Sequence, residues 1–362
     1  GQCAQLSMVG FKANRIAHVS AQALPAQLRW LILTDNAITA LPAEIGRCTH
    51  LQKLMLAGNQ LTSLPPELAH CTRLELLRIS ANRLRELPPW LLHMPRLTWL
   101  AFAGNPFTHA REAQALSQAS TPHIPWSRLE LQQQLGEGAS GVIHQARLQT
   151  DHGTQAVAVK LFKGAVTSDG LPDCEMAACI QTGTHPHVVS AMGRVTAHPD
   201  NTQALVMPLI SPEFGNLAGP PNFETCTRDV YASTQRFGFS QMRQMVHSVA
   251  SAAQHLHARG ITHGDLYAHN ILHTSDGRAL LGDFGAAAFF DMENTTQARG
   301  LERLEVRALG YLLEELLTRT DVTPDETAHH QTLTRLAQQC LSESPTQRPS
   351  LAQVCAELEK RE

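Results

Sequence analysis

The sequence predicts two domains of different fold class: an α/β array of stacked repeats, followed by a domain in which strands come before helices. Three observations support this prediction. Segments of one nine-residue pattern start every 23 residues from Leu28 to Leu97. This period ends after Phe107, and two prolines interrupt the chain between residues 121 and 126. From Leu129 onward, apolar strands flank a glycine-rich turn, and helical stretches follow them.

The composition limits the classes of function. The chain has 362 residues, is 43% hydrophobic and carries a net charge of −3. This charge gives no reason to expect nucleic acid or an anionic membrane as a partner, and we predict neither. No apolar run is long enough for a membrane span. The eight cysteines include no CxxC pair, so we expect free thiols in a reducing compartment, either the cytoplasm or, for a pathogen protein, the inside of a host cell.

The leucine and asparagine positions of each repeat explain why the repeats stack. Each segment carries alternating leucines that point to one side of a short strand, as Leu31 and Leu33 do. Each ends in an asparagine whose side chain can bond backbone groups where the strand turns, so these asparagines are expected to form a ladder. One repeat cannot bury its apolar face alone, so neighbouring repeats must stack. The four segments are LRWLILTDN, LQKLMLAGN, LELLRISAN and LTWLAFAGN, ending at Asn36, Asn59, Asn82 and Asn105.

This LxxLxLxxN pattern resembles the leucine-rich repeat. The resemblance implies an α/β solenoid over residues 1–109, with about five repeats. Gly1 aligns with the tail of a repeat, so we expect further repeats upstream of it. Residues 110–127 are expected to form a capping helix and a linker.

The concave face of such an array carries an unusual amount of apolar surface. One outward column contains Trp30, Leu76 and Trp99, and the next contains Met55 and Arg78. Large apolar patches mark interfaces. We therefore predict that this face binds a protein substrate or regulator, or alternatively the rest of the same chain.

The second domain contains an ordered set of motifs: GEGASG, VAVK, a glutamate in a helical stretch, HGDLYAHN, DFG and SPTQRPS. This set resembles a eukaryotic-type protein kinase, of the serine/threonine-like kind. The resemblance implies an α+β fold of two lobes over residues 128–362, with a small lobe at 128–207, a hinge at 208–211 and a large lobe at 212–362. Leucine-rich repeats joined directly to such a domain also resemble a family of soluble bacterial repeat-kinases.

The kinase resemblance implies ATP and Mg²⁺, or Mn²⁺, as cofactors and assigns roles to individual residues. Lys160 would hold the phosphates and pair with Glu175. Asp283 and Asn270 would bind the metal, and Asp265 would orient the incoming hydroxyl and accept its proton. The residues expected around the nucleotide are Gly136, Gly138, Ala139, Ser140, Gly141, Ile143, Ala158, Lys160, Met207 and Leu209.

Several positions depart from the kinase pattern. Gly264 replaces the arginine that commonly binds an activation-loop phosphate, so that switch is expected to be absent. Tyr267 and His269 stand where a phosphate-contacting lysine or arginine is usual. The activation segment is short and lacks Ala-Pro-Glu. Arg348 is therefore expected to pair with Glu293, which spacing favours over Glu302.

The leading interpretation is an ATP- and Mg²⁺-dependent protein kinase that phosphorylates Ser or Thr, itself included, while the repeats recruit a substrate or regulator. The alternative is a nucleotide-binding pseudokinase that acts as a scaffold. A third is a kinase fold that acts on a small molecule, which would need a closed, charged pocket over Asp265.

Overall fold

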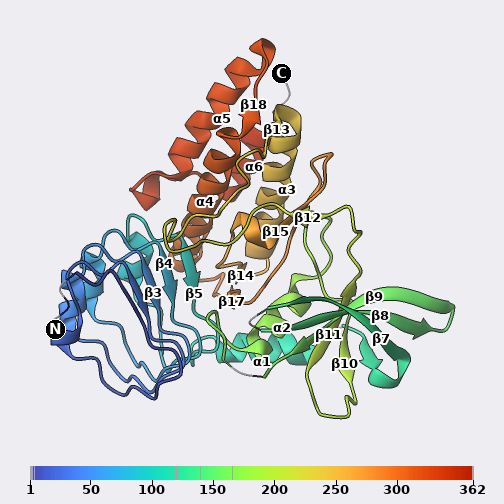
Figure 1. Cartoon of the computed structure of the whole chain (residues 1–362), viewed down its shortest axis with the longest axis horizontal. Coiled ribbons are helices and arrows are strands. Elements are labelled where there is room, and N and C mark those ends of the chain that lie inside the picture. Colours follow the sequence, from blue (N-terminus) through green and yellow to red (C-terminus); the bar gives the residue numbers. More distant parts are fainter. Residues whose placement is uncertain (1–2, 4, 119–120, 139, 165, 361–362) are drawn as a thin grey trace.

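The computed structural model of the chain describes residues 3, 5–118, 121–138, 140–164 and 166–360. Three bodies meet at its centre: the repeat region (residues 5–109), a mixed sheet (residues 123–208) and a helical part (residues 212–360) (Figure 1). Gly1 and Ala139, for which the sequence made predictions, lie outside the described residues.

The repeat region forms a parallel sheet whose strands follow chain order, as the stacking of neighbouring repeats requires. Its register sets Trp30 beside Lys53, Lys53 beside Leu76, and Leu76 beside Trp99, so the predicted outward column exists. The strands are β1 Met8–Gly10, β2 Trp30–Ile32, β3 Lys53–Met55, β4 Leu76–Arg78 and β5 Trp99–Ala101. The 3₁₀-helices on the opposite side are η1 Ala21–Ala23, η2 Ala43–Arg47, η3 Pro66–His70 and η4 Pro89–His93.

The asparagine ladder forms as predicted. Asn59 accepts a hydrogen bond from the Ile38 backbone N–H at 3.0 Å, and its side-chain amide donates to the carbonyls of Leu33 and Leu56, both at 2.9 Å. Asn82 and Asn105 bond in the same way one and two repeats later. These bonds satisfy buried backbone groups between neighbouring repeats.

The mixed sheet begins earlier than the sequence predicted. Residues 123–125 lie within the expected linker but form β6, an edge strand that pairs in parallel with β10. Ile124 is buried there, and only a glycine at 193 leaves room for it. The sheet order is β6-β10-β11-β9-β8-β7. Its strands are β6 His123–Pro125, β7 Leu129–Glu137, β8 Gly141–Thr150, β9 Gly153–Phe162, β10 Gly193–Thr196 and β11 Ala204–Pro208, with η5 Trp126–Arg128 before β7.

Two helices lie side by side between the repeat region and the sheet (Figure 1). The first, α1 His109–Gln118, follows the last repeat, as predicted for a capping helix. The second, α2 Pro172–Thr182, is buried along most of its length. The end of the last repeat reaches α2 directly, since a side chain at Gly104 would contact Leu171 and Cys174.

The helical part packs around two long helices, α3 Phe239–His257 and α4 Thr295–Leu317. The remaining helices are α5 Thr327–Cys340, α6 Leu351–Glu359, η6 Ala268–Asn270, η7 Pro324–Glu326 and η8 Pro345–Gln347. Short strands join the loops: β12 Gly215–Asn216, β13 Phe237–Gly238, β14 Ile261–Thr262, β15 Ile271–His273, β16 Ala279–Leu281, β17 Ala288–Phe289 and β18 Thr320–Asp321. No helix among the described residues is both long and apolar enough to cross a membrane.

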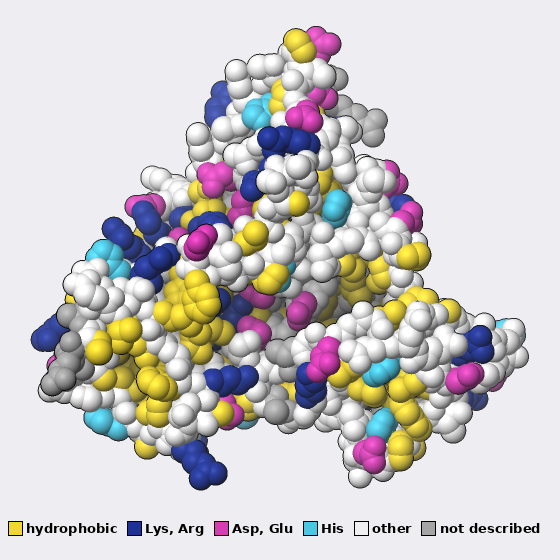
Figure 2. Space-filling view, viewed as in Figure 1, with side chains coloured by type: hydrophobic (Ala, Val, Ile, Leu, Met, Phe, Trp, Pro, Cys, Tyr) yellow, Lys and Arg dark blue, Asp and Glu magenta, His cyan; other side chains and the backbone are white. Residues whose placement is uncertain are grey.

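The repeat region and the helical part share their apolar cores. Leu76 and Trp99 belong to the cluster that fills the space between α3 and α4. In return, Phe290, Leu301 and Leu304 belong to the cluster formed by the repeat leucines. Figure 2 shows hydrophobic side chains gathered where these two bodies meet. Because each cluster contains residues of both bodies, separating the two bodies would expose both clusters.

Candidate active site

A cavity of about 760 Å³ lies between the mixed sheet and the helical part. One side is apolar, and the other holds Lys160, Asp169, Glu175, Asn270 and Asp283. A flat apolar slot beside a charged end suits a nucleotide. The structure brings the predicted nucleotide-contacting residues Gly138, Ser140, Gly141, Ile143, Ala158, Lys160, Met207 and Leu209 to this cavity, whereas Gly136 does not line it.

The glycine-rich turn joins β7 to β8 over the cavity. Gly138 donates its N–H to the Gly141 carbonyl at 2.9 Å, which closes the turn. A Cβ atom at Gly141 would lie 2.5 Å from the Leu161 carbonyl oxygen, so only glycine fits there. A Cβ at Gly136 or Gly138 would meet nothing within 4 Å. Packing therefore requires only one of the three glycines, and the other two leave space in which a ligand can approach the backbone.

Lys160 on β9 forms an ion pair with Glu175 on α2 at the charged end of the cavity. Both side chains are largely shielded from solvent, with exposed fractions of 13% and 3%. Burial acts to lower the pKa of Lys160, but Glu175 and Asp283 outweigh it and raise that pKa. Lys160 therefore stays cationic, as a phosphate-binding lysine must.

The loop that contains Asp265 is held by its neighbours. The Asn270 amide donates to the backbone carbonyl of Asp265 at 2.9 Å and to its Oδ2 at 3.0 Å. His263 is fully buried and bonds the Gly282 carbonyl at 2.9 Å, which ties this loop to the strand before Asp283. Asn270 uses its NH₂ group to bond Asp265, so its amide oxygen is not engaged by Asp265.

Asp283 and Asn270 together could hold a divalent metal beside a bound phosphate. Asp283 has a positive φ of 52°, which is strained for a non-glycine residue, and it accepts the Gly285 N–H at 3.1 Å. Both residues line the cavity, and both side chains carry oxygen atoms. The described residues contain no group of three or more His, Cys, Asp or Glu that could cage a metal alone. Two oxygen-bearing side chains are enough for a divalent metal that also takes substrate phosphates as ligands.

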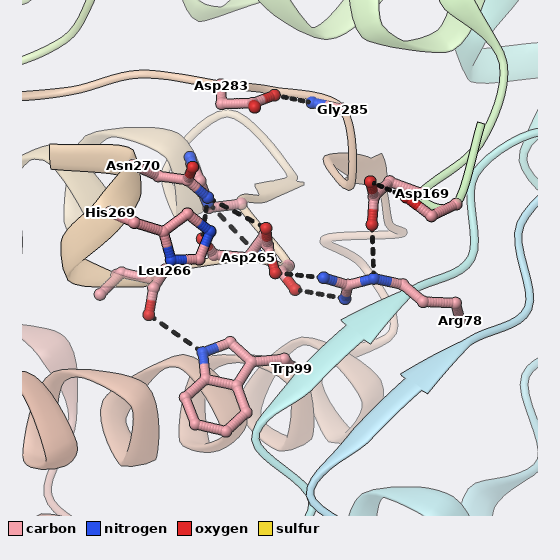
Figure 3. Close-up of polar contacts among 12 residues, drawn as sticks. Arg78, Trp99, Asp169, Asp265, Leu266, His269, Asn270, Asp283 and Gly285 are labelled. Atoms are coloured by element: carbon pink, nitrogen blue, oxygen red, sulfur yellow. Dashed lines mark hydrogen bonds and ion pairs between the residues drawn. The ribbon is translucent and has the colours of Figure 1, made fainter. Parts of the chain in front are cut away.

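The repeat region supplies a residue of the site that the sequence analysis did not assign. Arg78, at the end of β4, forms an ion pair with Asp265 and another with Asp169, 2.7 Å long (Figure 3). It also donates to the Gly264 carbonyl at 3.0 Å. The signal available in the sequence was an arginine in an outward column of otherwise apolar residues.

Trp99 holds the same loop from the next strand. Its indole N–H donates to the Leu266 carbonyl at 3.0 Å (Figure 3), and its ring stacks on Tyr267 with centroids 4.0 Å apart. Trp30 stacks on Phe223. The exposed fractions of Trp30, Leu76 and Trp99 are 9%, 3% and 2%. The predicted interaction face is therefore covered by the same chain, the second of the two alternatives, and these side chains are closed to an outside protein.

The predicted ion pair of Arg348 with Glu293 does not form. Arg348 is buried and donates to three backbone carbonyls, those of Ser342, Arg303 and Pro95. Glu293 is exposed in the turn before α4. The prediction was wrong because the repeat region, through Pro95, occupies the side of Arg348 where a carboxylate was expected. Burial lowers the pKa of Arg348 to about 9.

Glu305 on α4 supports the Asp265 loop through Gly264. It accepts the Gly264 N–H at 2.8 Å and bonds His257 at 2.6 Å. Burial acts to raise the pKa of Glu305, but His257 and the Gly264 N–H outweigh burial and lower that pKa below its ordinary value. The carboxylate therefore stays charged.

Known proteins resemble both parts of the chain. The family described as protein tyrosine and serine/threonine kinase matches residues 129–316, and the leucine-rich repeat family matches residues 26–84 and 49–107. Fibroblast growth factor receptor 1 of Pleurodeles waltl is 27% identical over 171 residues, which are 44% of this chain and 21% of that protein. A probable serine/threonine-protein kinase of Arabidopsis thaliana is 28% identical over 107 residues, 30% of this chain and 17% of that protein. The chain thus spans about a fifth of the length of these relatives.

Proposed function

The chain belongs to the protein tyrosine and serine/threonine kinase family, and we propose that it transfers the γ-phosphoryl group of ATP to Ser or Thr hydroxyls of proteins, itself included. One observation supports this proposal above the others. The Lys160–Glu175 ion pair, Asp283 and Asn270 line a single cavity of nucleotide size, and Asp265 is bonded to Asn270 beside it. An intact ion pair of this kind is a requirement for activity in protein kinases.

Each group has a task that follows from its position. Lys160 binds phosphate oxygens, and Glu175 keeps the ammonium directed into the cavity. The open space beside Gly138 lets phosphate oxygens approach the backbone of the turn. Asp265 orients the acceptor hydroxyl and takes its proton, while the Asn270 amide keeps the carboxylate in place. Phosphoryl transfer depends on such positioning more than on covalent chemistry by the protein.

A protein kinase domain implies ATP and a divalent metal, and we propose Mg²⁺ or Mn²⁺. Asp283 and Asn270 would hold it through their oxygen atoms. When bound, the metal neutralises the charge that develops on the transferred phosphoryl group. Asp283 stays in its strained conformation through the bond to Gly285, which keeps its carboxylate in the cavity.

We further propose that the repeats recruit a substrate or regulator through the part of their face that stays open. Met8, Lys53 and Met55 are only half-buried, whereas the corresponding residues of β4 and β5 are covered. A partner would therefore bind at β1 and β3, beside Trp30 of β2, which Phe223 already covers.

The alternative function, a nucleotide-binding scaffold, is favoured by the surroundings of Asp265. Both of its carboxylate oxygens already have protein partners, Arg78 and Asn270. No lysine or arginine follows within the HGDLYAHN loop.

Intact-mass spectrometry after incubation with Mg²⁺ and ATP separates the two functions. We expect added mass in steps of one phosphate on the native protein and none on Asp265→Asn, with ATP affinity unchanged in the variant. Lys160→Met serves as the matched control that loses ATP binding as well. Bound ATP without any added mass, also with casein present as a general acceptor, would favour the scaffold. A mass step other than phosphate would contradict both functions.

A further inference from the structure

The loop around Asp265 lacks the cation that usually accompanies such an aspartate. Tyr267 is 5% exposed and lies under the Trp99 ring. His269 is turned towards Asp229, bonding its carboxylate at 2.7 Å through Nδ1 and at 3.0 Å through its backbone N–H. Neither side chain therefore forms a hydrogen bond or an ion pair with Asp265.

Arg78 places a charge there from the repeat region. Its three nitrogens are divided among Asp169, the Gly264 carbonyl and Asp265 (Figure 3). This fork of donors holds three groups in fixed directions, which a lysine ammonium cannot do. The side chain is 2% exposed and does not line the cavity. Arg78 therefore acts on the cavity through Asp265 and Asp169, without a surface of its own there.

The cost of burying Arg78 is offset only because both carboxylates face it. A buried charge is destabilising unless it is paired and hydrogen-bonded. Burial acts to lower the pKa of Arg78, but Asp265 and Asp169 raise it above its ordinary value. The guanidinium therefore stays charged, as arginine does in proteins.

Gly264 is what lets the repeat region come close enough. Its φ is +72°, and a Cβ atom there would lie 2.7 Å from the Leu100 carbonyl oxygen on β5 and 2.6 Å from that of Ala286. An arginine at this position would push β5 away. The residue missing from the loop and the residue supplied by β4 are thus two parts of one arrangement.

We propose that the repeat region supplies, through Arg78, the cation that the Asp265 loop lacks, and that Arg78 is a positioning residue for Asp265. This inference rests on the proposed phosphoryl transfer. Arg78 fixes Oδ1 while Asn270 fixes Oδ2, so the plane of the carboxylate is set from two sides. Asp169 precedes α2, so the same guanidinium also joins the Asp265 loop to the helix that carries Glu175.

The arrangement is a permanent part of the site and not a releasable brake. A brake must detach, and detachment here would expose Trp99 and Leu76, which belong to the core between α3 and α4. Burial of this apolar surface favours the closed state. The repeat region is therefore expected to remain docked during turnover.

The test compares Arg78→Lys and Arg78→Gln in the full chain, with Arg85→Gln as the control at an exposed position of the same repeat. Both substitutions at 78 keep a polar, unbranched side chain, nearly as long as Arg in Lys and shorter in Gln, so the docking of β4 is expected to survive. Phosphate transfer to casein would give kcat and the KM for ATP. We expect a kcat lower by about 10²-fold in Arg78→Gln, the scale of a lost positioning contact, and a smaller loss in Arg78→Lys.

The KM for ATP should stay within twofold of the native value, because Arg78 does not line the cavity. In the Asp265→Asn background, Arg78→Gln should change the residual rate less than threefold, since both act through one carboxylate. Equal kcat in native and Arg78→Gln proteins would overturn the inference and leave the proposed function standing. A higher kcat in Arg78→Gln would overturn it by showing a brake. A native chain that binds ATP but transfers no phosphate would remove both.

Discussion

The outward face of the repeat region differs between its two ends, although the repeat pattern is the same. In β4 and β5, Leu76, Arg78 and Trp99 are buried against the Asp265 loop and the helical part. In β1 and β3, the corresponding Met8 and Lys53 remain half-buried. The leucines and asparagines that stack the repeats are alike at both ends. The fold of a repeat is therefore set by its inward positions, and its role in the site by a few outward ones.

Trp99→Ala is the substitution expected to have the largest effect on the contact at the buried end. The ring loses its stacking on Tyr267, its bond to the Leu266 carbonyl and its place in the core. We expect the free energy of unfolding to fall by about 4 kcal/mol, the usual cost of removing a buried Trp. Urea denaturation would measure it. The matched control, Met8→Ala in the same column, should cost less than about 1 kcal/mol, and similar losses at the two positions would contradict the difference between the ends.

The second substitution closes the space that β5 needs. Gly264→Ala adds a Cβ within 3 Å of two carbonyl oxygens and forces a positive φ on alanine. We expect a destabilisation of about 3 kcal/mol, combining backbone strain with overpacking.

Gly164→Ala is the control for this substitution. Gly164 has a φ of +71° with nothing within 4 Å of its Cβ position, so it tests the backbone strain alone. Thermal unfolding of both variants would isolate the close approach of β5. If the two variants lost the same stability, Gly264 would be required for its φ only.

Whether a feature of the fold or site could be predicted depends on how far apart in the sequence its interacting residues lie. The repeat strands, the asparagine ladder and the Lys160–Glu175 pair each follow from short patterns or a single recognised family. Arg78 and Asp265 are 187 residues apart, and no local pattern joins them. The predicted Glu293 partner of Arg348 failed for the same reason, since Pro95 of the repeat region takes that place. Contacts between two domains depend on how the domains dock, and the sequence pattern of neither domain specifies this.

A third prediction concerns Glu75, which lies beside the outward column and bonds the segment covering it. Its carboxylate accepts from Thr227 and pairs with Arg228 at 3.3 Å, and it is 5% exposed. Glu75→Gln removes the charge but keeps the shape. We expect a loss of about 2 kcal/mol, the scale of a buried charged hydrogen bond. Glu44→Gln, the same change at a half-buried position of η2, should be close to neutral in the same urea titration. A loss at Glu44 equal to that at Glu75 would show that the effect is not specific to this contact.

The smallest expected effect concerns the bond between Asp229 and His269. Asp229 directly follows Thr227 and Arg228, which contact Glu75. Burial acts to lower the pKa of His269, but its bond to Asp229 and the charges of Asp229, Asp265 and Asp283 raise it. A histidine whose pKa is raised by folding adds stability that is complete below its unfolded pKa of about 6.5 and is lost as the pH rises through the folded value. His269→Gln should therefore be less stable than the native protein by about 1.5 kcal/mol at pH 5.5, the scale of a charge-assisted bond, with a smaller difference at pH 9. Urea titrations at the two pH values measure this, and His50→Gln, a histidine outside the contact, serves as the control. A difference that grew with pH would mean that Asp229 binds the neutral imidazole. Asp229 would then hold the Asp265 loop through an uncharged histidine, and this contact would not depend on a positive charge.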